Sequence, residues 1–222
     1  MESFRSRLTQ LQRELLEAFF RHEREFFLTG GGALAGFYLG HRETSDLDFF
    51  TTEAAAFERG SHALRTAAAD VGGALASRQD APGFRRYFVS RGSEGVVVDL
   101  VWERVPQARP VKADAPAGIR IDPVEEILAN NLTAVLSRSE ERDLVDLLCL
   151  ERAGYKVESA LADALRKDGG CTPAALAYVL GEIRVPDGAV LPGGVSSVEL
   201  RTWLAGAVER LLHAAAPEPP RW

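Results

Sequence analysis

The sequence predicts an α+β fold in two parts: a mixed sheet with flanking helices over residues 1–115, and a helical part over residues 116–222. Short apolar segments with strand character alternate with helical segments up to about residue 102. The stretch 103–120 is rich in proline and glycine, as a connecting arm would be, and beyond it the apolar spacing is helical throughout. With 222 residues, 46% of them hydrophobic, the chain can bury one sizeable core or two modest ones.

The first part is expected to alternate strands and helices. Strands are expected at about residues 26–29, 46–52, 84–90 and 95–102. Helices are expected over residues 3–24, 33–39 and 54–69. Since the tight turn Arg91-Gly92-Ser93-Glu94 joins the last two strands, these strands are predicted to form a hairpin.

The second part is expected to be helical from Asp122 onward. Pro123 suits the first turn of a helix, and Glu125 and Glu126 complement the positive end of its dipole. Further helices are expected at about residues 139–154, 157–168, 173–184 and 196–215, with a loop over 185–195.

Acidic residues at strand positions are the first chemical signal. Asp46 and Asp48 are two residues apart and should project from the same face of a strand whose other face is buried. Two such carboxylates repel each other unless a cation joins them, and a divalent metal is the usual solution. Asp99 supplies a third acid on a later strand, so the three would form an oxygen-rich site suited to Mg²⁺. The alternative is that all three are solvated acids at strand ends and turns.

Three glycines precede this acidic pair. Gly30, Gly31 and Gly32 form a predicted turn between a strand and a helix, where backbone N–H groups can bind a phosphate. The alternative is a purely geometric role for the glycines. Arg42 and Thr44 lie just before the acids, and Arg42 could bind phosphate, brace the acids, or be an ordinary surface arginine.

A further charged cluster is predicted on one helix. Arg142 and Asp146 are four residues apart and hence neighbours on one face, with Asp143 close to it. A surface salt bridge is the simplest interpretation, and such bridges contribute little to stability.

Taken together and in this order, three blocks resemble the polymerase-β-like nucleotidyltransferase superfamily, and within it the AbiEii/AbiGii toxin family of bacterial type IV toxin–antitoxin and abortive-infection systems. The blocks are GGGAL with HRETSDLDFF (30–50), VVVDLV (96–101), and NLTA through SR to RDLVDL (131–147). The resemblance implies Mg²⁺-dependent transfer of a nucleoside monophosphate from a nucleoside triphosphate to a hydroxyl of RNA, such as tRNA, or of a protein. It also implies a cognate antitoxin as partner.

The resemblance also assigns expected roles to residues. The metal ligands would be Asp46, Asp48 and Asp99, and these would share catalysis with Asp143 and Asp146. The nucleotide would be bound by Gly30, Gly31, Gly32, Arg42, Thr44, Arg138 and Arg142.

Two departures from the family pattern bear on activity. Gly32 stands where the family usually has Ser or Thr, and Asn131 stands where it usually has a lysine that meets the nucleotide phosphates. The three lysines of the chain, Lys112, Lys156 and Lys167, lie outside the motifs, and Arg138 or Arg142 could supply the phosphate cation instead.

These departures keep rival hypotheses open. One is a nucleotide-binding but catalytically weak protein that acts through partner contacts, and another is a metal-dependent phosphodiesterase that uses water as acceptor. A purely structural helical partner would leave the strand acids unexplained.

The composition of the chain limits the possible substrates and the cellular location. The net charge is −6 and neither half of the chain is basic, so a polynucleotide substrate would need a local patch such as Arg85-Arg86 with Arg91. Such a run is also typical of a solvated strand edge. The charged N-terminus does not resemble a signal peptide, and no apolar run is long enough to span a bilayer, which together predict a cytoplasmic protein with no membrane partner.

Overall fold

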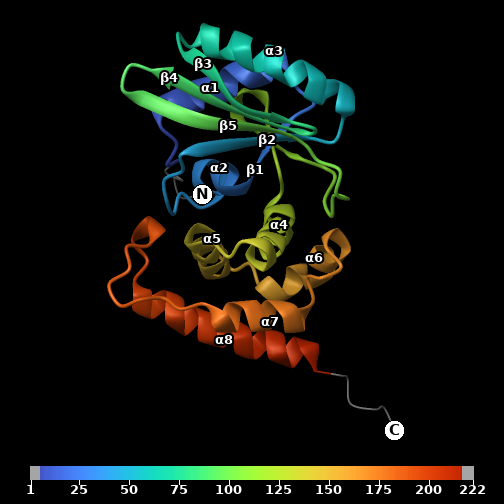
Figure 1. The fold of residues 1–222 in the computed structure, drawn as a ribbon, viewed down its shortest axis with the longest axis vertical. Coiled ribbons are helices and arrows are strands. Elements are labelled where there is room, and N and C mark those ends of the chain that lie inside the picture. The colour runs from blue at the N-terminus through green and yellow to red at the C-terminus, as the bar shows by residue number, and fades with distance from the viewer. Residues whose placement is uncertain (1–5, 217–222) are drawn as a thin grey trace. The chain divides into compact units, whose positions relative to one another are not determined.

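The computed structural model describes residues 6–216, drawn as a ribbon in Figure 1. The chain forms two compact units. The first comprises the residues up to Val105 together with Arg109–Val124, and the second comprises Pro106–Ala108 with the residues from Glu125 onward. The change between the units falls at Val124, whereas the sequence predicts a division after residue 115.

The first unit contains a seven-stranded sheet. Its strands are β1 (Phe27–Thr29), β2 (Asp46–Thr51), β3 (Ala74–Ala81), β4 (Phe84–Arg91), β5 (Glu94–Trp102), β6 (Ala113–Ala115) and β7 (Ile119–Ile121). Its helices are α1 (Gln10–His22), α2 (Gly30–Ala33), the π-helix η1 (Leu34–Tyr38), α3 (Ala54–Asp70) and the 3-10 turn η2 (Pro116–Gly118).

The sheet is mixed, as the sequence predicts. Its strand order is β3-β4-β5-β2-β1-β7-β6. The pairs β2–β5 and β1–β7 are parallel, and the remaining pairs are antiparallel. The predicted hairpin is β4–β5, with Arg91 opposite Glu94.

Helices α1 and α3 lie on one face of this sheet (Figure 1). The ring of Phe19 on α1 stacks on Phe49 of β2 with 4.4 Å between centroids, and it meets Phe20 and Phe26 edge-on. All four rings are buried. Because side chains alternate along a strand, burial of Leu47 and Phe49 on this face turns Asp46 and Asp48 to the opposite face.

The N-terminal helix is shorter than the predicted 3–24. Helix α1 begins only at Gln10, because Thr9 has extended backbone angles and forms a capping box with Gln12. It ends at His22, and residues 3–5 of the prediction lie outside the described residues.

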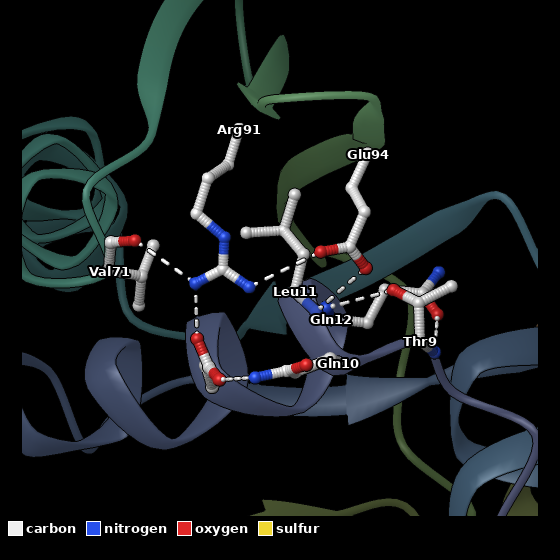
Figure 2. Close-up of polar contacts among 8 residues, drawn as sticks. Thr9, Gln10, Leu11, Gln12, Val71, Arg91 and Glu94 are labelled. Atoms are coloured by element: carbon white, nitrogen blue, oxygen red, sulfur yellow. Dashed lines mark hydrogen bonds and ion pairs between the residues drawn. The ribbon is translucent and has the colours of Figure 1, made fainter.

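Contacts at its first turn fix α1 to the β4–β5 hairpin (Figure 2). Arg91 donates to the carbonyl of Val71 and to Glu94, and it also pairs with Glu14. Glu94 in turn accepts a hydrogen bond from the backbone N–H of Leu11 at 3.3 Å. A carboxylate at the first turn satisfies a backbone donor that the helix itself leaves unpaired.

Three strands, β3, β6 and β7, were not predicted from the sequence. Strand β3 is an edge strand with mostly exposed side chains, so it lacks the apolar alternation that marks a half-buried strand. The predicted connecting arm 103–120 was wrong at its end, because it contains β6 and η2 and the start of β7. Buried Ile119 and Ile121 let β7 pair with β1 despite the nearby proline.

The glycine segment also differs from its prediction. The short helix was expected to begin at Ala33 after a glycine turn, but α2 begins at Gly30, so the glycines form the first helical turn. Thr29, the last residue of β1, is its N-cap residue.

The second unit is helical, as predicted. Its elements are α4 (Val124–Ser137), α5 (Glu141–Arg152), η3 (Val157–Ala160), α6 (Leu161–Lys167), α7 (Pro173–Glu182), η4 (Pro192–Gly194) and α8 (Ser197–Ala215). Thr172 and Ser196 cap α7 and α8 with their hydroxyl groups. Arg210 of α8 binds Glu151 of α5 and Glu158 of η3. No helix among the described residues is both long and apolar enough to cross a membrane.

Candidate functional site

A row of polar residues crosses the sheet of the first unit. Thr29 of β1 is opposite Asp48 of β2, Asp48 is opposite Asp99 of β5, and Asp99 is opposite Arg86 of β4. Residues directly opposite on neighbouring strands project from the same face. Asp46 lies two positions before Asp48 and therefore shares this face. The structure thus brings together the three acids that the sequence singles out.

Asp99 is held by Arg86. The Nε and Nη2 groups of Arg86 donate to the two carboxylate oxygens of Asp99 at 2.8 and 2.7 Å. The side chain of Asp99 is 7% exposed and that of Arg86 is 45% exposed. The pKa of Arg86 is raised above its usual value, first by its hydrogen bonds to Asp99 and then by the charges of Asp99, Asp48 and Asp46, while burial opposes the rise. Arg86 binds Asp99 directly, and the negative charges of Asp46 and Asp48 also favour its charged form.

The carboxylate of Asp46 is oriented by a chain of hydrogen bonds that starts at α1. The hydroxyl of Thr44 donates to Oδ1 of Asp46 at 2.7 Å. The backbone carbonyl of Thr44 accepts from Nε2 of Gln12 at 2.8 Å, and Gln12 is buried. The other end of the Gln12 amide accepts from the backbone N–H of Thr9. The helix cap and the orientation of Asp46 are therefore coupled through one buried amide.

The glycine segment lies directly against these residues. Gly30 has a φ of +59°, and a Cβ at this position would lie 3.0 Å from Oδ2 of Asp48. A Cβ on Gly31 would lie 2.6 Å from Nη2 of Arg42, so this guanidinium is in contact with the glycine backbone. Gly30 suits its left-handed backbone angle, and at both positions an added Cβ would make the end of a neighbouring side chain, Asp48 or Arg42, move.

Gly32, the position where a hydroxyl residue is usual in the resembled family, is tightly packed. A Cβ there would lie 3.3 Å from a methyl group of Leu28 and 3.4 Å from one of Leu47. A serine or threonine side chain there would require the neighbouring leucine side chains to give by a few tenths of an ångström.

The acids suit a hard divalent cation by their donor chemistry. Carboxylate oxygens are the ligands that Mg²⁺ prefers, and a guanidinium already supplies positive charge beside them. Within residues 6–216, no group of three or more His, Cys, Asp or Glu side chains is arranged as a metal site. Asp46, Asp48 and Asp99 as metal ligands stay a prediction.

The remaining predicted residues lie in the helical unit. Asp143 and Asp146 are buried on α5. Arg138 donates to both oxygens of Asp143 at 2.9 and 2.8 Å, and Arg142 pairs with Glu140 at 2.7 Å. Phosphate-binding and catalytic roles for these four residues stay predictions.

Asn131, which stands in the position of the family lysine, and two of the chain's lysines are buried. Asn131 is buried, and its Nδ2 group has no hydrogen-bond partner among the described residues. In the first unit Lys112 pairs with Asp122 at 2.6 Å, and in the second Lys167 pairs with Glu126 at 2.5 Å. All four of these ion-pair side chains are less than 5% exposed, so neither lysine replaces an exposed phosphate-binding group.

Sequence reasoning did not assign Arg86, Gln12 or Thr29 to the site. For Arg86 a usable signal exists: once Arg91 and Glu94 are taken as the ends of a hairpin turn, counting back along both strands pairs residue 86 with residue 99. For Gln12 no such signal exists, because its partner Thr44 is distant in the sequence.

The chain matches one protein-family model and several solved structures. The family model described as nucleotidyl transferase AbiEii toxin, type IV TA system, matches residues 14–188. Among solved structures, JHP933 from Helicobacter pylori has a TM-score of 0.54 at 20% identity, covering 93% of this chain and 92% of that one. MenT4, a nucleotidyltransferase toxin from Mycobacterium tuberculosis H37Rv, has a TM-score of 0.53 at 15% identity, covering 93% of this chain and 82% of that one. These likenesses show a shared fold. No curated protein is similar enough in sequence to match.

Replacing Gly30 by alanine tests the contact between the glycine segment and Asp48. The left-handed backbone costs alanine about 1–2 kcal/mol, and the added methyl group also pushes on Asp48. Gly72→Ala is the matched control, because Gly72 has a φ of +69° and open space around its Cβ position. We expect Gly30→Ala to lower the free energy of unfolding in urea more than Gly72→Ala does. Equal losses would contradict the proposed contact.

Replacing Gln12 by methionine tests the buried amide. The substitution keeps the volume but leaves the Thr44 carbonyl and the Thr9 N–H without their partner. We expect a loss of about 1–3 kcal/mol in the free energy of unfolding, the usual cost of unpaired buried polar groups. Gln10→Met is the control, since the exposed amide of Gln10 donates to Glu14 of its own helix and not to a buried backbone group, and it should change stability by less than about 0.5 kcal/mol.

Proposed function

The chain belongs to the AbiEii nucleotidyl transferase toxin family of type IV toxin–antitoxin systems, and we propose that it transfers a nucleoside monophosphate from a nucleoside triphosphate to an acceptor hydroxyl with the help of Mg²⁺. The observation that carries this proposal is the row of Asp48, Asp99 and Arg86, with Asp46 on the same face. The proposed acceptor is an RNA, such as tRNA, or a protein.

Asp46, Asp48 and Asp99 are the proposed ligands of Mg²⁺. When bound, the metal would neutralise the charge that develops on the phosphoryl oxygens and on the departing pyrophosphate. Thr44 would keep the carboxylate of Asp46 in one orientation, as ligand carboxylates usually require a hydrogen-bonding partner.

The glycine segment would bind the phosphates. Because Gly30 and Gly31 have no side chain, a phosphate could reach their backbone beside Asp48, where Arg42 would add a guanidinium donor. The acceptor oxygen would attack the α-phosphorus while the bond from that phosphorus to the bridging oxygen breaks. Pyrophosphate leaves with the bonding electrons, and the hydroxyl proton passes to water.

Residues of the helical unit also have proposed roles in this reaction. We propose that Arg138 or Arg142 supplies the phosphate cation that the family lysine provides elsewhere, and that Asp143 or Asp146 contributes to catalysis. Arginine can take this role because its planar guanidinium binds two phosphate oxygens at once. A cognate antitoxin is the proposed protein partner, as the type IV family implies.

One observation favours a second candidate function, nucleotide binding with little turnover. Asn131 stands in the lysine position, and Arg138 already binds both oxygens of Asp143. If these replacements do not serve the phosphates, the protein would bind a nucleotide and act through its partner.

Incubation with each α-³²P-labelled nucleoside triphosphate and Mg²⁺ tests the proposal, with total bacterial RNA and the protein itself as acceptors. We expect label to be transferred to one acceptor class. Asp48→Asn should lower the transfer rate by more than about a hundredfold, because changes outside the ligand sphere alone often cost 10–100-fold.

Asp80→Asn is the control, since Asp80 is an exposed acid elsewhere on the sheet whose partner is Arg85. It should leave transfer unchanged. Nucleotide binding without any transfer would favour the second candidate. Release of nucleoside monophosphate without an acceptor would identify a phosphodiesterase that uses water, and equal rates for the two aspartate variants would contradict the acidic site.

A further inference from the structure

Arg86 and a divalent cation would compete for the carboxylate of Asp99. Both oxygens of the Asp99 carboxylate already accept hydrogen bonds from one guanidinium. The guanidinium occupies one side of each oxygen, and its positive charge repels a metal ion that approaches the same carboxylate, so each weakens the binding of the other.

The surroundings of Asp99 explain why a cation is needed there at all. Asp48 is its direct neighbour across β2–β5, and Asp46 shares the face. Asp99 is almost fully buried, where an uncompensated carboxylate is costly. Arg86 therefore offsets charge that a divalent cation could offset instead.

The shape of the Arg86 side chain allows it to leave. Nearly half of the side chain is exposed, and its other close neighbour is the ring of Phe84, at 5.5 Å from the guanidinium carbon to the centroid. A long arginine side chain can keep its apolar stem on the sheet while its head moves into water. Asp99, by contrast, is fixed within a central strand.

We propose that Arg86 is a positioning residue that holds Asp99 while the site contains no metal and competes with the divalent cation for this carboxylate. This inference rests on the proposed metal role of the three acids. The competition lowers the affinity for the metal alone. A bound triphosphate, which accepts hydrogen bonds from arginine, would take over the guanidinium and so favour metal and nucleotide binding together.

Titration of the full-length protein with Mn²⁺, followed through the electron paramagnetic resonance signal of the free ion, tests the competition without any need for activity. Arg86→Gln removes the competing charge and should bind Mn²⁺ about three- to tenfold more tightly than the wild type, in keeping with a partly exposed bidentate pair. Arg86→Lys keeps the charge without the planar fork and should lie between them.

Arg85→Gln is the matched control. Arg85 is the next residue on the same strand, but its partners are Glu58, Asp80, Ser61 and the carbonyl of Phe57. The control removes the same formal charge away from the acids, so its Mn²⁺ affinity should equal that of the wild type.

Thermal unfolding of the same proteins gives a second readout. Without metal, Arg86→Gln leaves Asp99 buried and unpaired, so its unfolding midpoint should fall below that of the wild type. Added Mn²⁺ should raise that midpoint by more than it raises the wild-type midpoint. A purely structural salt bridge would give the fall without the larger rise.

The outcomes separate the inference from the function on which it rests. Mn²⁺ binding that Asp48→Asn does not weaken, or that is undetectable in wild type and Arg86→Gln alike, overturns the proposed metal site and the inference with it. If Asp48→Asn weakens Mn²⁺ binding but Arg86→Gln matches Arg85→Gln or binds more weakly than the wild type, the competition alone is wrong.

Discussion

Charge repulsion among Asp46, Asp48 and Asp99 is the constraint on which the rest of this site depends. The parallel pairing of β2 with β5 puts Asp48 directly opposite Asp99, and the pleat brings Asp46 to the same face. Nearby cations stabilise such an arrangement by offsetting the repulsion. The first unit supplies one of them from the next strand, where Arg86 binds Asp99 through both carboxylate oxygens.

Packing on the other face of the sheet holds these acids in position. The stack of Phe19 on Phe49 fixes β2 against α1, and the buried amide of Gln12 carries that contact through Thr44 to Asp46. The glycine segment that follows β1 lies against Asp48, and a Cβ at Gly30 would push on its carboxylate. Core packing and site geometry are therefore linked by a continuous chain of contacts from α1 to the carboxylate of Asp46.

The sequence was sufficient for the features that depend on local pattern, and insufficient for those that depend on distant pairing. The acidic strand, the hairpin and the helical second half follow from periodicity and turn residues. Strand β3 has no buried face, and β7 is held by a parallel partner far away in the chain, so neither has a local signal. Of the site, the three acids were predictable as a group, and Arg86 becomes so once the hairpin register is counted. The link from Gln12 to Asp46 needed the tertiary structure.

The most direct test of this account is a crystal structure of the protein with Mg²⁺ and a non-hydrolysable nucleoside triphosphate. We expect a metal ion bound by Asp46 and Asp48, the phosphates against Gly30 and Gly31, and Asp99 no longer bonded to Arg86 through both oxygens. A nucleotide and metal bound away from these acids would contradict the proposed function. A metal bound by the acids while Arg86 still holds both oxygens of Asp99 would contradict the competition.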